Sequence, residues 1–226
     1  MRCRVELSRR HPCLSLEEAL ALAEVGNCTA GMLGERAAEF VCPSCGVFHR
    51  AALARSINGR RVRKERPSLE RLPRTLDHIT ARLMVNLARV TRGSKVWEPF
   101  VGSGAIAHEV ERAGGYVVGS DTDLKALHVA RRNTCGDLAL SSATLPPLRG
   151  GFDAAVGDPP YGRLTKSSTT VRALLYAFLN AALSAVKPGG YIVFASPIYV
   201  DLPYLKSCAM YLHSGLYRVV YITRAG

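Results

Sequence analysis

The second half of the chain alternates short apolar runs with segments of helical periodicity, and this alternation constrains the fold more than any other feature. Apolar runs predict buried strands over 95–100, 116–121, 138–141, 152–157, 191–195 and 217–222. Apolar residues at helical spacing predict helices over 77–89, 105–113, 123–133 and 171–186, with another over 205–212 and a turn at 188–190. Strands that alternate with helices form a doubly wound, mainly parallel sheet, so the predicted fold class is α/β.

The first 65 residues predict a smaller α+β unit. A short strand over 4–7 precedes a helix with Ser15 as its N-cap and Glu18 as the capping-box partner, and Gly26 ends that helix. Two strands are predicted over 37–41 and 47–57. Prolines at 67 and 73 bracket the segment that follows, which is typical of a linker. We therefore expect a unit over 1–65, a basic linker over 66–75 and a larger domain over 76–226.

The cysteines do not predict a metal site. Seven scattered cysteines are typical of reduced thiols in a cytosolic protein. Cys42 and Cys45 have the spacing of a zinc knuckle, but a closed zinc site needs four ligands, and Cys28 and His49 are the nearby candidates. A tight hairpin turn or a reversible disulfide are the alternatives for this pair.

The charge of the chain favours a polyanionic partner. Thirty Lys and Arg residues oppose eighteen Asp and Glu, a formal charge of +12. Residues 50–74 alone carry nine basic and two acidic side chains, which are either a solvated face or phosphate contacts. We expect RNA contacts from this segment and from a polar loop after 162, at the residues Arg60, Arg61, Arg63, Lys64, Arg163 and Lys166. No membrane span or export signal is visible, which predicts a cytoplasmic protein without a membrane partner.

The segment Asp158-Pro159-Pro160-Tyr161 follows an apolar strand and predicts a rigid exit from the sheet. An exocyclic amine on a nucleobase is a poor nucleophile, because its lone pair is delocalised into the ring. Acceptors aimed at its N–H groups favour a pyramidal nitrogen, and Asp158 with the Pro159 carbonyl supplies two. The Tyr161 ring can stack on a base that has left its helix. The simpler interpretation is a proline-bracketed turn with a helix-capping aspartate.

A glycine-containing turn follows the strand at 95–100. Gly102 and Gly104 allow the backbone to approach a ligand closely, and Asp121 ends the next strand, where an acid can bind a ribose diol. The same spacing fits a nicotinamide dinucleotide fingerprint. Glu98-Pro99 before the glycines and the absence of an obvious hydride-handling residue argue against a dehydrogenase.

These motifs resemble class I S-adenosylmethionine-dependent methyltransferases, and more narrowly the archaeal tRNA guanine N2-methyltransferases that modify the guanosine at position 10. The resemblance covers the chain from residue 65 onward, and residues 5–7 with the following helix weakly resemble the family's ferredoxin-like unit. The motifs that carry it are Leu83–Ala88, Glu98-Pro99-Phe100-Val101-Gly102-Ser103-Gly104, Gly119–Asp123 and Asp158-Pro159-Pro160-Tyr161-Gly162-Arg163.

The resemblance implies S-adenosylmethionine as cofactor, tRNA as partner and methyl transfer to guanine N2. Asp158, Pro159 and Tyr161 would then hold the base. The implied cofactor residues are Glu98, Pro99, Gly102, Gly104, Asp121, Thr122, Ser142 and Ala143. Adenine-N6 methylation of DNA or RNA, or a non-catalytic RNA-binding subunit, are the alternatives.

The chain departs from the family pattern at two points. The family usually carries an RNA-binding THUMP domain before the linker, and this chain has no room for one. An acid that usually contacts the adenine amine is replaced by Ser142. Some relatives work with a small zinc-containing activator protein, which is a candidate partner here.

Overall fold

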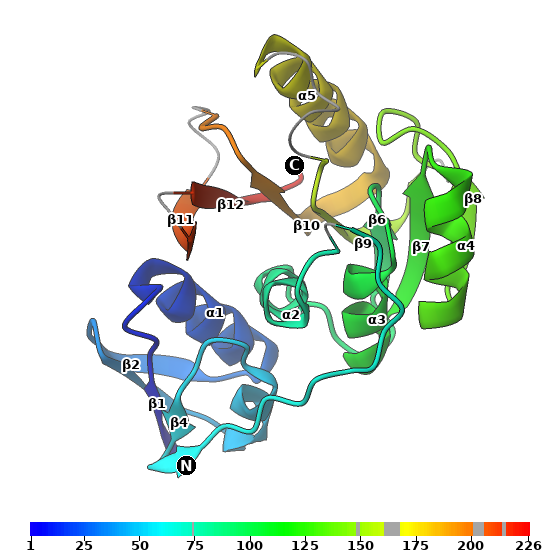
Figure 1. Cartoon of the computed structure of the whole chain (residues 1–226). Helices are drawn as coiled ribbons and strands as arrows, with labels where there is room; N and C mark the ends of the chain where they lie inside the picture. The colour runs from blue at the N-terminus through cyan, green and yellow to red at the C-terminus, as the bar shows by residue number, and fades with distance from the viewer. Residues whose placement is uncertain (74, 148–149, 161–167, 201–205, 214–215) are drawn as a thin grey trace.

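The computed structural model describes all residues except 74, 148–149, 161–167, 201–205 and 214–215, and it contains two β-sheets (Figure 1). A five-stranded sheet lies within residues 2–61, and a seven-stranded sheet lies within residues 95–224. Figure 1 shows the smaller sheet and helix α1 (Pro12–Val25) below the helices and strands of the larger unit. The α/β class predicted from the sequence is confirmed.

The smaller sheet is antiparallel throughout, with the strand order β2-β3-β1-β4-β5. Its strands are β1 (Arg2–Glu6), β2 (Thr29–Leu33), β3 (Ala37–Val41), β4 (Ser56–Ile57) and β5 (Arg60–Arg61). Because side chains alternate along a strand, Cys3 and Val5 of β1 share one face with Ala38 and Phe40 of β3. These four side chains are fully buried and form a core with Leu22 of α1.

Two local predictions for this unit are wrong. Helix α1 begins at Pro12 with His11 at its N-cap, because proline is tolerated where a helix has no partner for its first N–H groups. Ser15 lies inside the helix, where its hydroxyl accepts a hydrogen bond from Ser8 N at 2.9 Å. The predicted strand over 47–57 is instead a 3₁₀ helix, η1 (Cys45–Arg50), followed by the short β4. The strand at 37–41 and the end of α1 at Gly26 are confirmed.

Six of the seven cysteines form disulfides, which corrects the expectation of reduced thiols. The pairs are Cys3–Cys45, Cys13–Cys208 and Cys28–Cys42. Strand register explains one of them: Thr29 lies opposite Val41, so the next residues outward, Cys28 and Cys42, face each other. Cys42 and Cys45 therefore have different partners and are not bonded to each other. Within the described ranges, no group of three His, Cys, Asp or Glu side chains is arranged to hold a metal ion.

The larger sheet has the strand order β11-β12-β10-β9-β6-β7-β8. Its strands are β6 (Lys95–Glu98), β7 (Tyr116–Asp121), β8 (Asp137–Leu140), β9 (Phe152–Gly157), β10 (Val186–Ser196), β11 (Lys206–His213) and β12 (Leu216–Arg224). The pairs from β8 to β10 are parallel, and β12 is antiparallel to both of its neighbours. The predicted mainly parallel sheet is thus confirmed.

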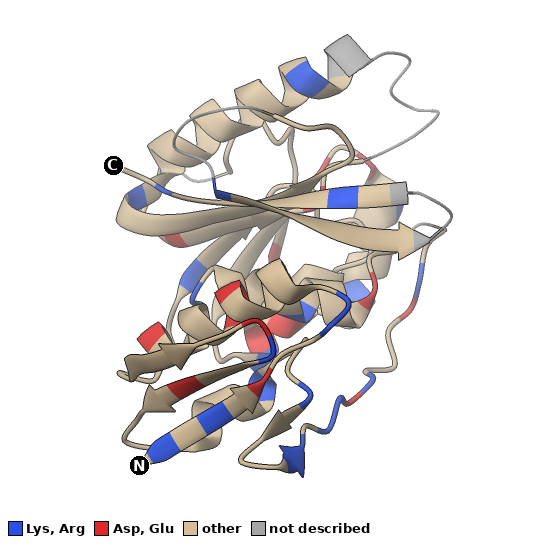
Figure 2. Cartoon of the chain, turned by 90° about the vertical axis from the view of Figure 1, so that its left-hand side faces the viewer, with Lys and Arg blue, Asp and Glu red and all other residues tan. Residues whose placement is uncertain are grey.

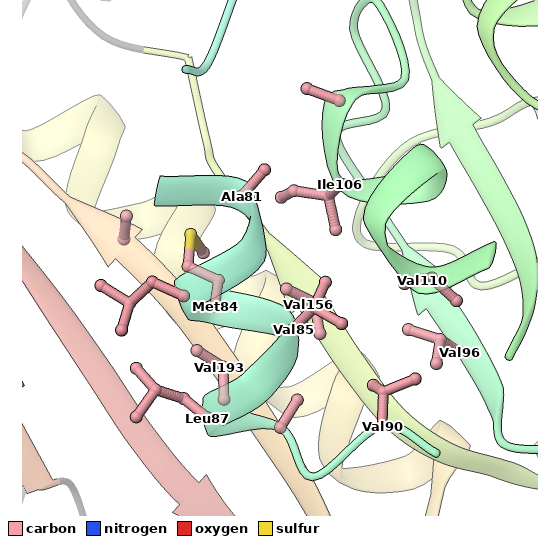
Figure 3. Close-up of a cluster of buried hydrophobic side chains, with 14 of the residues drawn as sticks. Ala81, Met84, Val85, Leu87, Val90, Val96, Ile106, Val110, Val156 and Val193 are labelled. Carbon is pink, nitrogen blue, oxygen red and sulfur yellow. The ribbon is translucent and has the colours of Figure 1, made fainter. Parts of the chain in front are cut away.

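Helices cover both faces of this sheet. Helices α2 (His78–Leu87), α3 (Ala105–Arg112) and α4 (Leu124–Asn133) pack on one face, and α5 (Ser168–Ala185) packs on the other. Neighbouring residues of β6 point to opposite layers: Val96 joins the α2–α4 side and Trp97 joins the α5 side. Figure 3 shows Met84, Val85 and Leu87 of α2 gathered with apolar side chains of the central strands. Among the helices described, none has the length and apolar character of a membrane span.

Two predictions near the C-terminus are wrong. Residues 205–212 were expected to be helical, but 206–213 form β11. Along β11, Cys208 and Met210 are buried whereas Ala209 and Tyr211 are exposed, which is the two-residue period of a strand. The turn expected at 188–190 lies inside β10, where the register with β9 shifts between Val186 and Tyr191.

A buried polar network joins the small unit to α2. The carboxylate of Glu18 on α1 accepts hydrogen bonds from Ala52 N at 2.6 Å, Leu53 N at 2.8 Å and Asn86 Nδ2 at 2.7 Å. Asn86 Oδ1 in turn accepts from Arg50 Nε at 2.8 Å. The two units therefore share an interior, and the predicted domain boundaries at 65 and 75 stay a prediction.

We expect the Cys13–Cys208 disulfide to stabilise the chain, because it closes a loop with a sequence separation of 195 residues. Replacing both cysteines with serine should lower the free energy of unfolding by about 2–4 kcal/mol in denaturant titrations. Cys135→Ser, at the exposed free thiol, is the control and should change it by less than about 0.5 kcal/mol. Alkylation of Cys13 and Cys208 before any reduction would contradict the linkage.

Candidate active site

Three acidic residues meet at one edge of the larger sheet. Glu98 is the last residue of β6, Asp121 is the last residue of β7, and Asp158 directly follows β9. Because β9, β6 and β7 are adjacent and parallel, their carboxyl ends lie together, at the edge where open α/β sheets bind ligands. All three residues line a cavity of about 1120 Å³.

The turn between β6 and α3 holds one of these acids in place. Gly102 and Gly104 have φ values of 51° and 82°, a region that favours glycine. Gly102 N donates a hydrogen bond to Asp121 Oδ2 at 2.9 Å, and Asp123 N donates to Oδ1 at 2.9 Å. A Cβ atom at Gly104 would lie 3.4 Å from Ala130 Cα, an ordinary contact distance, so the positive φ and not a lack of space favours glycine there.

Glu98 is the most deeply buried of the three carboxylates. Glu98 is only 1% exposed, and its Oε2 has no hydrogen-bond partner among the described residues. Burial raises the pKa of Glu98 well above its usual value; the Asp121 and Asp158 carboxylates raise it further, whereas a hydrogen bond from the Ala107 backbone lowers it. A buried acceptor of this kind suits a cationic group on a ligand, since a nearby positive charge favours the ionised carboxylate.

The structure brings nine of the predicted site residues into one cavity wall. They are Glu98, Pro99, Gly102, Asp121, Thr122, Ser142, Ala143, Asp158 and Pro159. Gly104 lies between Ser103 and Ala105, which line the cavity, but is itself set back from the wall. Tyr161, Arg163 and Lys166 lie outside the described residues. The roles assigned to these residues stay predictions.

The predicted linker forms part of the same wall, which the sequence did not indicate. Leu72, Pro73 and Thr75 line the cavity. Asn133 of α4 fastens this segment, because its Nδ2 donates to Glu70 O at 2.8 Å and to Ser103 O at 2.7 Å. A basic stretch between prolines has the composition of a simple connector, so its composition carries no signal of a role in the cavity wall.

One cation reaches the cavity from the last strand. Arg218 on β12 lines the cavity, and its Nη2 lies 3.7 Å from Asp158 Oδ2. The Arg218 side chain is 13% exposed and that of Asp158 is 14% exposed. Sequence reasoning missed Arg218, because only the strand order places β12 near β9, with β10 alone between them.

Four of the basic residues predicted to contact RNA are described, and they lie outside this cavity. Arg60 and Arg61 form β5, Arg63 and Lys64 begin the segment that leads to α2, and all four residues are exposed. Figure 2 shows this segment running along one side of the molecule, with Lys and Arg positions spaced along it. Basic residues therefore extend from the small unit to the segment that lines the cavity.

The fold and the position of the cavity define a class I methyltransferase architecture. Residues 63–209 match the family described as RMKL-like, methyltransferase domain. This range is more than half of the chain, and the chain belongs to that family.

Several tRNA methyltransferases are similar in sequence. The tRNA (guanine(10)-N2)-dimethyltransferase of Methanothermobacter thermautotrophicus is 34% identical over 163 residues, covering 66% of this chain and 48% of that protein. The protein of the same name from Methanocaldococcus jannaschii is 30% identical over 177 residues, covering 70% of this chain and 49% of that protein. The tRNA (guanine(6)-N2)-methyltransferase of Thermus thermophilus is 30% identical over 141 residues, 56% of this chain and 42% of that protein. This chain spans about half the length of the first two relatives.

Solved structures confirm the fold class. TrmN from Thermus thermophilus superimposes with a TM-score of 0.59 at 20% identity, covering 99% of this chain and 81% of that chain. A methyltransferase from Pyrococcus furiosus has a TM-score of 0.52 at 17% identity, covering 70% of this chain and 88% of that chain. The similarity to TrmN extends across the small N-terminal unit as well as the larger sheet.

Replacing Glu98 with glutamine should stabilise the ligand-free chain at neutral pH. The folded state raises the pKa of Glu98 above its unfolded value, so the unfolded carboxyl ionises first as the pH rises. Stability is therefore lost as the pH rises from the unfolded pKa toward the folded pKa, and the loss persists at higher pH. A neutral amide avoids it, with a gain of about 1–3 kcal/mol at pH 7 that disappears below about pH 4.

Urea unfolding of both proteins across this pH range measures the effect. Glu35→Gln, at an exposed position, is the control and should change the free energy of unfolding by less than about 0.5 kcal/mol. A loss of stability in Glu98→Gln at neutral pH would contradict this account of the buried carboxyl.

Proposed function

We propose that this chain transfers a methyl group from S-adenosylmethionine to the exocyclic N2 amine of a guanosine in tRNA. The observation that carries the proposal is the single cavity shared by Asp158 and Pro159 with Gly102 and Asp121. The relatives described above are named as tRNA guanine N2-methyltransferases, which supports the same target here. Because this chain spans about half of the first two, its activity is inferred from its own site together with that similarity.

The residues of the cavity fit S-adenosylmethionine. The cofactor carries cationic ammonium and sulfonium groups, and four acidic side chains line the cavity: Glu98, Asp121, Asp123 and Asp158. Glu98, with one buried oxygen that lacks a partner in the described structure, would accept a hydrogen bond from the ammonium group. Gly102 would lie against the methionine part, and Asp121 would hold the ribose. When bound, S-adenosylmethionine supplies an electrophilic methyl group.

Asp158 and Pro159 would prepare the amine of the base. Pro159 and Pro160 restrict φ immediately after β9, so the Asp158 carboxylate and the Pro159 carbonyl are presented with little freedom. Two acceptors directed at the N–H groups favour a pyramidal nitrogen and the positive charge that develops on it. The low exposure of Asp158 strengthens this electrostatic effect, and its carboxylate would receive the proton that the methylated nitrogen loses.

The basic segment beside the cavity supports tRNA as the partner. Exposed arginines between β5 and α2 would contact phosphates, which position an RNA without reading its sequence. We also propose that a small zinc-containing activator protein assists this chain in recognising tRNA. Its support is the resemblance to a family in which some members use one.

Replacing Asp158 with asparagine should lower methyl transfer to tRNA by about 10²–10³-fold, because a charged acceptor is lost at the amine. Binding of S-adenosylmethionine, measured by calorimetry, should stay within a few-fold. Asp153→Asn is the matched control, because Asp153 lies on β9 and pairs with Lys187 at 2.8 Å away from the cavity. The product is identified by digesting the tRNA to nucleosides.

The identity of that nucleoside separates the alternatives. N2-methylguanosine is the expected product, and N6-methyladenosine would favour an adenine methyltransferase instead. A chain that binds cofactor but methylates no tRNA, with or without an activator protein, would contradict the proposal.

The triple replacement of Arg60, Arg61 and Arg63 by alanine should weaken tRNA binding. If each arginine neutralises one phosphate, the slope of log affinity against log salt should become less steep by up to about three. A control variant with the same change in charge replaces Arg2, Arg36 and Arg92, which are also exposed. Equal losses in both variants would show that this segment has no special role.

A further inference from the structure

We propose that Arg218 recognises the oxygen at position 6 of the target guanine. This assignment rests on the proposed function and extends it, because it names the side chain that selects the base. No motif in the sequence indicates this role, and it comes from the position of β12 beside the cavity.

The strand registers fix where Arg218 lies relative to Asp158. On β10, Phe194 pairs with Gly157 of β9, and Ser196 pairs with Val219 of β12. Asp158, just after β9, is therefore level with Ala195, and Arg218, within β12, is level with the position after Ser196, two residues further along, with β10 between them. Two strand spacings amount to roughly 9–10 Å, which an arginine side chain can cross. Its guanidinium accordingly ends 3.7 Å from the Asp158 carboxylate.

The charges around the cavity make Arg218 distinct. Of the described residues that line the cavity, four are acidic and Arg218 is the one basic side chain. The acidic side chains suit the ammonium and sulfonium groups of the cofactor. A guanidinium also pairs with carboxylates such as the cofactor's own, but Arg218 lies 3.7 Å from Asp158, the residue assigned to the base. Arg218 instead suits an acceptor on the other reactant, and its 13% exposure places that acceptor inside the cavity rather than at the outer surface.

The Watson–Crick edge of guanine matches this pair of side chains. The edge presents the N2 amine, the N1–H donor and the O6 acceptor in that order. With the amine held by Asp158 and Pro159, the adjacent guanidinium meets the O6 end of the edge. Arginine donors paired with guanine O6 are a common contact in nucleic-acid recognition, and unpaired RNA bases are read along this edge.

Two other roles for Arg218 lead to different results. If it only keeps Asp158 ionised and oriented, its loss slows methylation of every base that presents an amine at position 2. If it contacts an RNA phosphate, its loss likewise acts on all bases equally. Only contact with O6 makes the effect of Arg218 depend on the atom at position 6.

The test is a double-mutant cycle between Arg218 and the base. The tRNA nucleotide that the wild-type chain methylates is mapped first, and a ligated tRNA then carries 2-aminopurine there. This base keeps the N2 amine and lacks O6. We expect the ratio of kcat/KM for guanine to that for 2-aminopurine to fall by roughly tenfold in Arg218→Met. 2-Aminopurine also lacks the N1–H group of guanine. Any preference for guanine that Arg218→Met keeps therefore reports the contact to N1–H.

The controls keep the assignment falsifiable. Arg224→Met removes an exposed arginine at the other end of β12 and should leave the ratio unchanged. If Arg218→Met is inactive on both RNAs, Arg218→Lys decides, because lysine keeps the charge but lacks the planar fork. A several-fold fall in the guanine to 2-aminopurine ratio of kcat/KM in Arg218→Lys supports the assignment. An unchanged ratio in whichever of the two Arg218 variants is active overturns it. If the wild-type chain methylates no RNA, the proposed function and this assignment both fail.

Discussion

The parallel pairing of β6 with β7 and β9 is the constraint on which the rest of the structure depends. It sets Glu98 opposite Gly119 and Trp97 opposite Ala155, so each strand delivers its terminal acid to the same edge. Trp97 Nε1 donates to Ser120 Oγ at 3.1 Å, which adds a buried side-chain contact between β6 and β7. Like charges that repel one another are thus held together by the packing of the strands beneath them.

The acids meet there because each follows its own strand directly, and this is also why the sequence predicts much of the site. The boundaries of β7 agree with the prediction, because an uncharged run of β-forming and small residues ends at Asp121 there. The Asp123 cap of α4 is likewise local, since its carboxylate accepts from Lys125 N two residues later. Fold class and cavity residues could therefore be predicted from short segments.

What the sequence could not provide depends on contacts between distant parts of the chain. Arg218 enters the cavity only because β12 inserts between β10 and β11, which no local pattern encodes. The disulfides depend on strand register and on the position of α1 against its neighbours. Cys13, for example, is 195 residues from its partner. The strand at 206–213 was mistaken for a helix because a short apolar segment satisfies both periods until its buried face is known.

Helix α2 contacts both the small unit and the larger sheet. Met84 and Val85 of α2 belong to the apolar cluster over the central strands, while Asn86 bonds to Glu18 and Arg50 of the small unit. Two positions beyond the end of the helix, Arg89 pairs with Glu24 of α1 at 3.1 Å. Helix α2 thus packs between the small unit and the larger sheet. Displacement of the small unit would disturb the helical layer that packs on the sheet.

The covalent bond between Cys13 and Cys208 has a topological consequence. It joins the beginning of α1 to β11, so nearly the whole backbone lies within one closed ring. A protease that cuts once anywhere between these two residues opens the ring without releasing a fragment. On a denaturing gel, the nicked chain would migrate as one species until a reductant separates its two pieces.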